Sequence, residues 1–208
     1  MNVRDKLPKR RNEPTKNPSK GKWSQHKPDL RIDFNEHCGY CGSYDGFRHT
    51  WFEVDHFIPK SFFEPLGNMT TEHYTNLVYS CKFCNNIKSD KWPTNSEDIF
   101  NENEEGFVDP CDIDFDNHFY RTDDGAIMWS SDLGKWMFTK AFKFDERVNS
   151  IKILWNLNQI RKVLDALVEL LKQEVEESDA YNNIKLKAQE YSFQYYLYHK
   201  ELIDFYNE

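Results

Sequence analysis

Residues 38–41 read CGYC, residues 81–88 read CKFCNNIK, and the octapeptide EVDHFIPK lies between them at residues 53–60. Two Cys-x-x-Cys pairs separated by 40 positions, from Cys41 to Cys81, have the ligand spacing of a tetrahedral zinc site. One such pair alone is weak evidence for zinc binding, because redox-active thiol motifs have the same Cys-x-x-Cys spacing. The two together predict a structural Zn²⁺ ion bound by Cys38, Cys41, Cys81 and Cys84.

The composition is that of a somewhat polar protein able to form one domain, or a small domain with an appendage. The chain has 208 residues, of which 38% are hydrophobic and 30% charged. No apolar run approaches the roughly 18 residues of a membrane span, and no charged-then-apolar leader precedes a cleavage site. We therefore expect a cytoplasmic protein without membrane attachment. In that reducing compartment the fifth cysteine, Cys111, is expected to be a small buried hydrophobe.

The net charge of −8 is unevenly distributed. Residues 1–31 hold ten Lys or Arg against three acids, a charge of +7, whereas residues 95–124 hold eleven acids against Arg121, a charge of −10. A basic arm beside an acidic middle is compatible with phosphate contact at one end. It is equally compatible with a solvated tail, because basic tails are common.

The pattern along the chain predicts an α+β fold, with a small zinc-bound core of two strands and a helix and a mainly helical C-terminal region. Helical turns are expected at 29–34, strands at 47–52 and 53–58, and a helix from the second cysteine pair through Lys88. A hairpin is expected at 125–142, with strands at 126–129 and 136–138. Helices are expected from about 145 and over about 180–206. The expected segments are a flexible arm (1–30), a core around the two cysteine pairs (31–95) and an acidic linker, hairpin and helical docking region (96–208).

The chemistry of phosphodiester hydrolysis points to the residues between and beside the cysteines. An activated water is needed, together with a group that stabilises charge on the phosphate. Asp55 and Asn85 offer the oxygen ligands that hold a hard divalent cation. His56 is the natural general base because its usual pKa lies near neutrality, and a bend near Pro59 would let it share a cleft with Asp55. Glu53 lies on the same strand face as Asp55 and either tunes the site or is merely exposed.

Taken in order, Cys-x-x-Cys, Asp-His, Asn-Leu and Cys-x-x-Cys-Asn-x-x-Lys over residues 38–88 resemble the HNH endonucleases of the ββα-metal superfamily. The resemblance implies that His56 is the general base and that Asp55 and Asn85 bind the catalytic ion. It further implies that Asn76 holds the loop of the base and that Lys88 contacts the phosphate or stabilises the transition state. Asn85 stands where most members carry histidine. This His-Asn-Asn variant favours an oxygen-preferring ion such as Mg²⁺ or Mn²⁺.

A narrower resemblance covers residues 31–165. The string DHFIPKS and the pattern YxNLxYxCxxCNxxK are similar to HNH proteins of Septu-type and retron-associated anti-phage systems, which implies an ATPase partner. The main expectation is thus a metal-dependent endonuclease acting on nucleic acid, most simply DNA. The alternative from another class is a non-catalytic four-cysteine zinc module that binds nucleic acid or a protein partner. Asp55, His56 and Asn85 favour the first, since a bare zinc module has no use for them.

Overall fold

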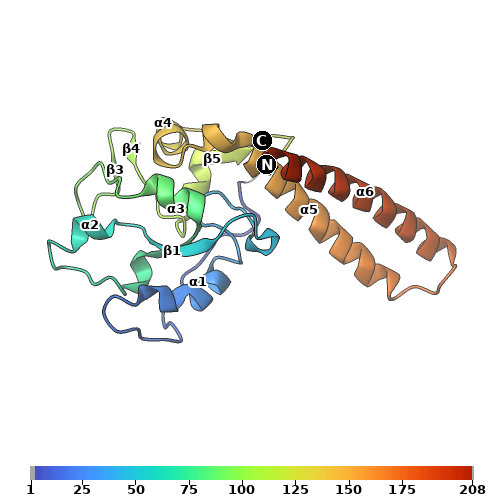
Figure 1. Cartoon of the computed structure of the whole chain (residues 1–208), viewed down its shortest axis with the longest axis horizontal. Helices are drawn as coiled ribbons and strands as arrows, with labels where there is room; N and C mark the ends of the chain where they lie inside the picture. Colours follow the sequence, from blue (N-terminus) through green and yellow to red (C-terminus); the bar gives the residue numbers. More distant parts are fainter. Residues whose placement is uncertain (1–2, 208) are drawn as a thin grey trace. The chain divides into compact units, whose positions relative to one another are not determined.

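The computed structural model describes residues 3–207 and divides the chain into two compact units, residues 1–148 and residues 149–208 (Figure 1). This division differs from the three segments expected from the sequence, because the first 30 residues and the acidic middle belong to the same unit as the cysteine pairs. The α+β class is confirmed: short two-stranded antiparallel sheets are combined with helices. Short 3₁₀ segments lie at Trp23–His26, Asp45–Phe47, Tyr74–Asn76, Ile113–His118 and Phe144–Arg147.

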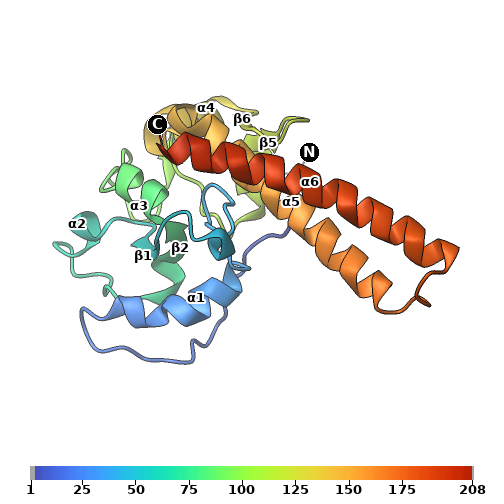
Figure 2. The same ribbon diagram turned by 45° about the vertical axis from the view of Figure 1, so that its right-hand side comes forward.

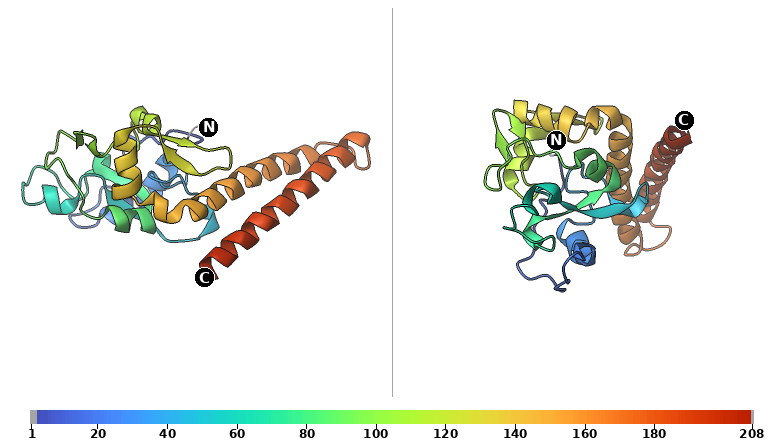
Figure 3. Two further views of the ribbon diagram at one scale, coloured as in Figure 1. Left: turned by 90° about the horizontal axis from the view of Figure 1, so that it is seen from above. Right: turned by 60° about the vertical axis from the view of Figure 1, so that its left-hand side comes forward.

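A strand pair followed by a helix positions the chemistry of unit 1. Strand β1 (Phe52–His56) pairs antiparallel with β2 (Leu77–Cys81), and helix α3 (Lys82–Lys88) follows β2 directly (Figure 2; Figure 3, right). Asp55 lies opposite Val78, and His56 lies opposite Leu77. All five residues of β2 are buried, so its apolar sequence fits a covered strand. The helix predicted through Lys88 is confirmed.

The strand predicted at 47–52 is wrong. Residues 45–47 form a 3₁₀ turn, Arg48 adopts a left-handed conformation with φ of 51°, and only Phe52 joins β1. The partner of β1 comes from residues 77–81, beyond a long connection that follows His56 and includes helix α2 (Lys60–Phe63). Pro59, which cannot donate to a sheet ladder, lies in this connection as the residue that precedes α2. The pairing is therefore nonlocal, which local sequence patterns do not reveal.

The basic N-terminal segment contacts the body of unit 1 through partly buried ion pairs. Arg4 pairs with Asp116 at 2.7 Å, Arg10 with Asp109 at 2.8 Å, and Arg11 with Asp29 and Asp33 at 2.8 Å each. Helix α1 (Lys27–Asp33) begins with a proline at its first turn, which suits the position because proline lacks the amide hydrogen. These side chains are held by carboxylates, two of them in the acidic middle, which differs from the flexible arm expected from the sequence.

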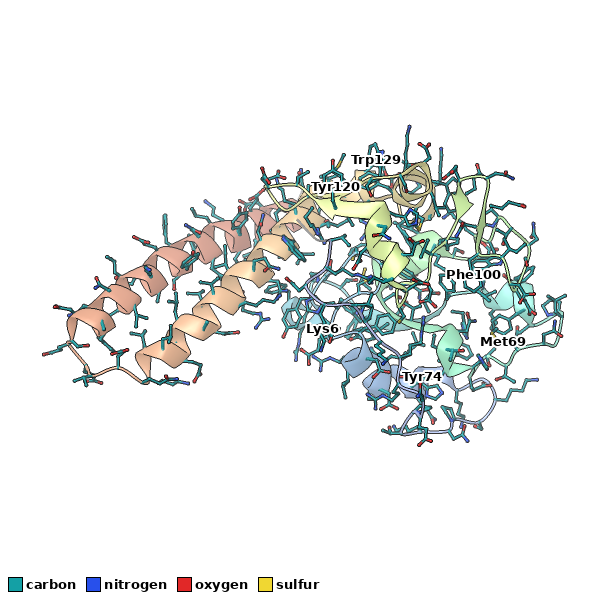
Figure 4. The ribbon with its side chains drawn as sticks, turned by 180° about the vertical axis from the view of Figure 1, so that it is seen from behind. Lys6, Met69, Tyr74, Phe100, Tyr120 and Trp129 are labelled. Carbon is teal, nitrogen blue, oxygen red and sulfur yellow. The ribbon has the colours of Figure 1, made fainter. Side chains whose placement is uncertain are left out.

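Tyr74 adds a further contact between the N-terminal segment and the loop before β2. Its hydroxyl donates to Asp33 at 2.7 Å, and its ring lies edge-on to the buried ring of His26. Figure 4 shows Tyr74 beside the N-terminal segment. The backbone amide of Gly21 also donates to Glu72. The segment is thereby attached at several points close to β1.

The acidic middle of unit 1 builds small sheets over an aromatic core. Strand β3 (Asn101–Glu102) pairs with β4 (Glu105–Gly106), and β5 (Phe119–Arg121) pairs with β6 (Ile127–Trp129). The predicted second hairpin strand at 136–138 is wrong: helix α4 (Asp132–Trp136) and a π-helical turn (Met137–Ala141) occupy that region. The Ser131 hydroxyl accepts from Gly134 N at 2.9 Å and caps α4, so a helix begins where the sequence pattern indicated a turn.

Unit 2 is a helical hairpin. Helix α5 (Val148–Leu171) and helix α6 (Asp179–Asn207) run antiparallel and are joined by the turn at 172–178 (Figure 3, left). The two long helices predicted in this region are confirmed. Within residues 3–207, neither these helices nor any other is both long and apolar enough to traverse a bilayer.

Candidate active site

The four predicted zinc ligands converge in unit 1. The Sγ atoms of the two cysteine pairs all lie within 4.8 Å of one another, and all four side chains are buried. The first pair sits in the turn after α1, whose Cys38 amide donates to Ser43 O and whose Gly39 amide donates to Tyr79 O. The second pair spans the end of β2 and the first turn of α3. The sheet and the helix thus present two thiols each to a common centre.

The arrangement of the sulfur atoms fits a Zn²⁺ ion. A tetrahedron with Zn–S bonds of about 2.3 Å has S···S edges of about 3.8 Å, and Cys41 Sγ lies 3.8 Å from Cys81 Sγ. Burial raises the pKa of Cys38 well above its usual range, whereas hydrogen bonding from Cys38 lowers that of Cys41. Four buried thiols so close together cannot all ionise unless a cation is shared among them. The donor set therefore matches a structural zinc site of the four-cysteine kind.

Two arginines of unit 1 contact this cysteine cluster. Arg147 Nη2 lies 3.3 Å from Cys84 Sγ, and its guanidinium covers the rings of Phe83 and Phe144. Arg121, completely buried, donates from Nη2 to Cys41 O at 2.9 Å. The pKa of Arg147 is raised: burial lowers it, but the charges of Cys84 and its neighbours outweigh that effect. A zinc ion bound by four thiolates carries a net charge of −2, which these guanidinium groups partly neutralise.

Replacing Arg147 with methionine is expected to weaken zinc binding by about 10- to 100-fold, the usual loss when an outer-shell partner of a metal site is removed. The methionine keeps the side-chain length but removes the charge beside Cys84. Zinc release to a chromophoric chelator would measure the effect. Arg48→Met, at an exposed position of the same unit, is the matched control. Equal release from both variants would contradict the support assigned to Arg147.

His56, the last residue of β1, is held in a defined orientation. Its Nε2 lies 2.9 Å from Thr71 O, and its ring contacts Trp23 and Phe63 at centroid distances of 5.1 and 5.7 Å. A carbonyl only accepts hydrogen bonds, so Nε2 carries the proton and Nδ1 keeps its lone pair. Among residues 3–207 no protein group bonds to Nδ1. In the neutral form of the ring, the second nitrogen is therefore available to accept a proton.

The electrostatic surroundings keep His56 in this neutral form. Burial lowers its pKa, and the nearby Lys88 and Lys60 lower it further, against the opposing effects of the Thr71 carbonyl and Asp55. A lowered pKa leaves the imidazole unprotonated near neutral pH, as a general base requires.

Asn76 spans the loop that follows His56. Its Oδ1 accepts from Ile58 N at 2.8 Å, its Nδ2 donates to Ile58 O at 3.1 Å, and its own carbonyl accepts from Phe57 N at 2.8 Å. The side chain is buried. A buried amide that satisfies both backbone groups of one residue fixes the chain where it leaves β1.

Asp55 and Lys88 form a buried pair close to the backbone of His56. Lys88 Nζ lies 3.4 Å from Asp55 Oδ2 and donates to His56 O at 2.8 Å, and its side chain is completely buried. Tyr40, from the first cysteine pair, donates its hydroxyl to Asp55 Oδ2 at 2.6 Å. Burial raises the pKa of Asp55 and lowers that of Lys88. In this geometry Lys88 is turned to the protein interior, away from any phosphate in solvent.

A pocket of about 210 Å³ opens where β1 and α3 end, and its lining includes Asp55, His56, Lys60, Ser89 and Asp90. Both contacts of the Asp55 carboxylate engage Oδ2. Its Oδ1 has no protein partner among residues 3–207. Aspartate oxygen is a suitable ligand for a hard divalent cation. The pocket therefore brings one proposed metal ligand and the proposed base together.

Asn85 is not brought to this pocket. Its Nδ2 donates to Glu53 Oε2 at 2.7 Å, and neither residue lines the pocket. Of the predicted pair of metal ligands, Asp55 fits a cation in the pocket, whereas Asn85 does not in this geometry. The second carboxylate on the pocket wall is Asp90, which follows the turn at Ser89, a residue with a φ of 49°.

Sequence reasoning did not identify several residues around the site. Tyr40, Lys60 and Asp90 lie next to recognised motif residues, and only their spacing could have drawn attention to them. Trp23 and Arg147 reach the site from outside the motif, and no local pattern signals their position.

Comparison with protein families bears on this geometry. A family model described as HNH endonuclease matches residues 38–91. The matched range contains both cysteine pairs, β1, β2, α3 and every residue that lines the pocket. The chain thus carries an HNH endonuclease domain with a four-cysteine cluster, which supports a nuclease-type function, metal dependence and nucleic-acid binding. Comparison with curated proteins gives no match, and neither does comparison with solved structures.

Proposed function

We propose that the protein is a metal-dependent endonuclease that hydrolyses phosphodiester bonds in DNA. The observation that carries this proposal is the oriented, neutral His56 beside Asp55 in one pocket. His56 Nδ1 accepts a proton from the attacking water while Thr71 O holds the opposite nitrogen. A divalent cation such as Mg²⁺ or Mn²⁺, held at Asp55 Oδ1, would stabilise the charge that builds on the phosphate.

In this proposal, Asn76 and Lys88 hold the reacting groups in place and do not contact the substrate. Asn76 fixes the loop after the base, and Lys88 anchors Asp55 and the His56 carbonyl. Lys60, exposed on the pocket wall, is the cation able to meet a phosphate oxygen there. Asn85 would need to leave Glu53 in order to bind the cation.

The pH dependence of cleavage tests the role of His56. Because only the neutral imidazole accepts a proton, the rate should fall as the pH drops through the His56 pKa. Burial lowers that pKa, so the acid limb of kcat/KM is expected below pH of about 6.5, the usual histidine value. Initial rates of nicking of supercoiled plasmid with Mg²⁺ or Mn²⁺ would measure it. A rate that rises on acidification would contradict the assignment, and binding without cleavage at any pH would favour the non-catalytic zinc module.

We further propose that the nuclease serves anti-phage defence together with an ATPase. This rests on the pattern at residues 31–165 and on the helical hairpin of unit 2 as a docking region. Capture of the product of the neighbouring gene by the full chain, but not by a chain ending at residue 148, the last of unit 1, would support it. Undiminished capture by the shortened chain would move the docking site to unit 1.

A further inference from the structure

A second cavity of unit 1, called the groove from here on, lies where β1 and α3 begin. Its volume is about 930 Å³, and its lining includes Arg48, Trp51 and Phe52 before and at the start of β1, and Lys82 and Phe83 at the start of α3. The pocket of His56 lies where β1 and α3 end. With a rise of about 1.5 Å per residue, α3 separates the two by about 10 Å. One bound polymer is therefore able to occupy both.

The charge of this groove is opposite to that of the chain. Four cations, Lys27, Arg31, Arg48 and Lys82, and one carboxylate, Asp45, line it, for a net charge of +3 in a chain of net charge −8. His49, also in the lining, adds no charge near neutral pH because burial lowers its pKa. A cluster of cations in a largely acidic protein indicates an anionic ligand.

The cations of the groove differ from those of the N-terminal segment in their partners. Arg4, Arg10 and Arg11 are bound by carboxylates of unit 1, and in the groove Arg31 pairs with Asp45 at 2.6 Å. Lys27, Arg48 and Lys82, in contrast, have no side-chain partner among residues 3–207. Their charges are therefore available to a ligand.

Trp51 gives the groove a flat apolar surface. Its side chain is 76% exposed, whereas its carbonyl accepts from Lys82 N at 2.8 Å, so a fixed backbone presents an exposed ring. Exposed aromatic rings beside phosphate-binding cations are the means by which proteins hold single-stranded nucleic acid, since an unpaired base stacks on the ring. A duplex keeps its bases stacked internally and offers the ring no such face.

We propose that this groove binds a single-stranded segment of the nucleic-acid substrate, with phosphates on Lys27, Arg48 and Lys82 and a base stacked on Trp51. This rests on the proposed nuclease function and extends it by naming the strandedness of the substrate beside the cleavage pocket. The strand continues along β1 and α3 toward His56.

Binding by the zinc-loaded full chain, without added Mg²⁺ or Mn²⁺, tests the groove separately from cleavage. The probe is a fluorescein-labelled single-stranded DNA of mixed sequence, followed by anisotropy over a series of salt concentrations. The Arg48→Glu/Lys82→Glu variant should lower the slope of log K against log salt by about 1.4, since each phosphate contact on a single strand contributes about 0.7. Trp51→Ala should weaken binding by about 5- to 150-fold through the lost stacking.

The controls make the same changes outside the groove. Lys135→Glu/Lys140→Glu removes two exposed cations of unit 1 with an identical change of charge, and Tyr120→Ala removes another exposed aromatic ring. Both should leave the dissociation constant unchanged. Equal losses in the groove and control variants would overturn the proposal, as would tighter binding of duplex DNA or of an acidic peptide of equal charge. Groove-dependent binding with no cleavage after Mg²⁺ or Mn²⁺ is added would instead reject the nuclease function and still support the groove.

Discussion

Replacing His56 with glutamine is expected to slow DNA cleavage by about 10²- to 10⁴-fold, the usual contribution of a general base. Glutamine keeps a donor for Thr71 O but has no nitrogen that accepts a proton from water. The loss should therefore appear in kcat, with substrate binding and thermal stability close to those of the unaltered protein.

His56→Ala and an exposed histidine provide the comparison. Alanine also removes the ring contacts with Trp23 and Phe63, so this variant is expected to lose stability as well as activity. His73→Ala alters a solvent-exposed imidazole before β2 and should cleave at the full rate. Unreduced cleavage by the glutamine variant would show that another group accepts the proton.

Removal of zinc is expected to unfold the core of unit 1. Structural zinc contributes roughly 10–16 kcal/mol in small zinc modules at neutral pH, whereas whole domains are stable by only roughly 5–15 kcal/mol. The four cysteines join the turn after α1 to the end of β2 and the start of α3, so the metal closes contacts between segments 40 residues apart. Without the metal, the four buried thiols would lie close together in the core with no ion to coordinate them.

Hydrogen exchange would locate this unfolding. Chelation of zinc, or the change Cys84→Ser, should abolish protection in β1, β2 and α3 and eliminate the cooperative thermal transition of unit 1. Cys111→Ser changes the one cysteine outside the cluster and should leave both unchanged. A metal-free protein with the same transition and the same protection pattern would show that packing alone holds the core.

The parts of the site that could be predicted from the sequence are those fixed by short-range spacing. The Cys-x-x-Cys pairs, the helix that follows Cys81 and the position of His56 at a strand end all depend on residues within a few positions of one another. Ligand geometry and helix entry are local requirements, so the sequence displays them directly. The two C-terminal helices were predictable for the same reason, from their apolar periodicity.

The remaining features depend on partners distant in the chain. The strand that pairs with β1 begins at Leu77, and the carboxylates that bind Arg4 and Arg10 lie about a hundred residues away. Charge counts alone could not show that Arg4 and Arg10 form ion pairs within the protein, whereas Lys82 and Arg48 line the groove. The orientation of Asn85 toward Glu53 and the burial of Lys88 depend on side-chain packing, which motif spacing does not specify.

The hydroxyl of Tyr40 joins the two chemistries of the domain, because it extends from between Cys38 and Cys41 to the carboxylate of Asp55. An oxidant that removes these thiols from the metal and links them as a disulfide is therefore expected to shift the donor that holds this aspartate. If the proposed nuclease function holds, cleavage should then stop although no residue of the cleavage pocket has reacted. We accordingly expect the proposed activity to share the redox sensitivity of the cysteines and to require reducing conditions.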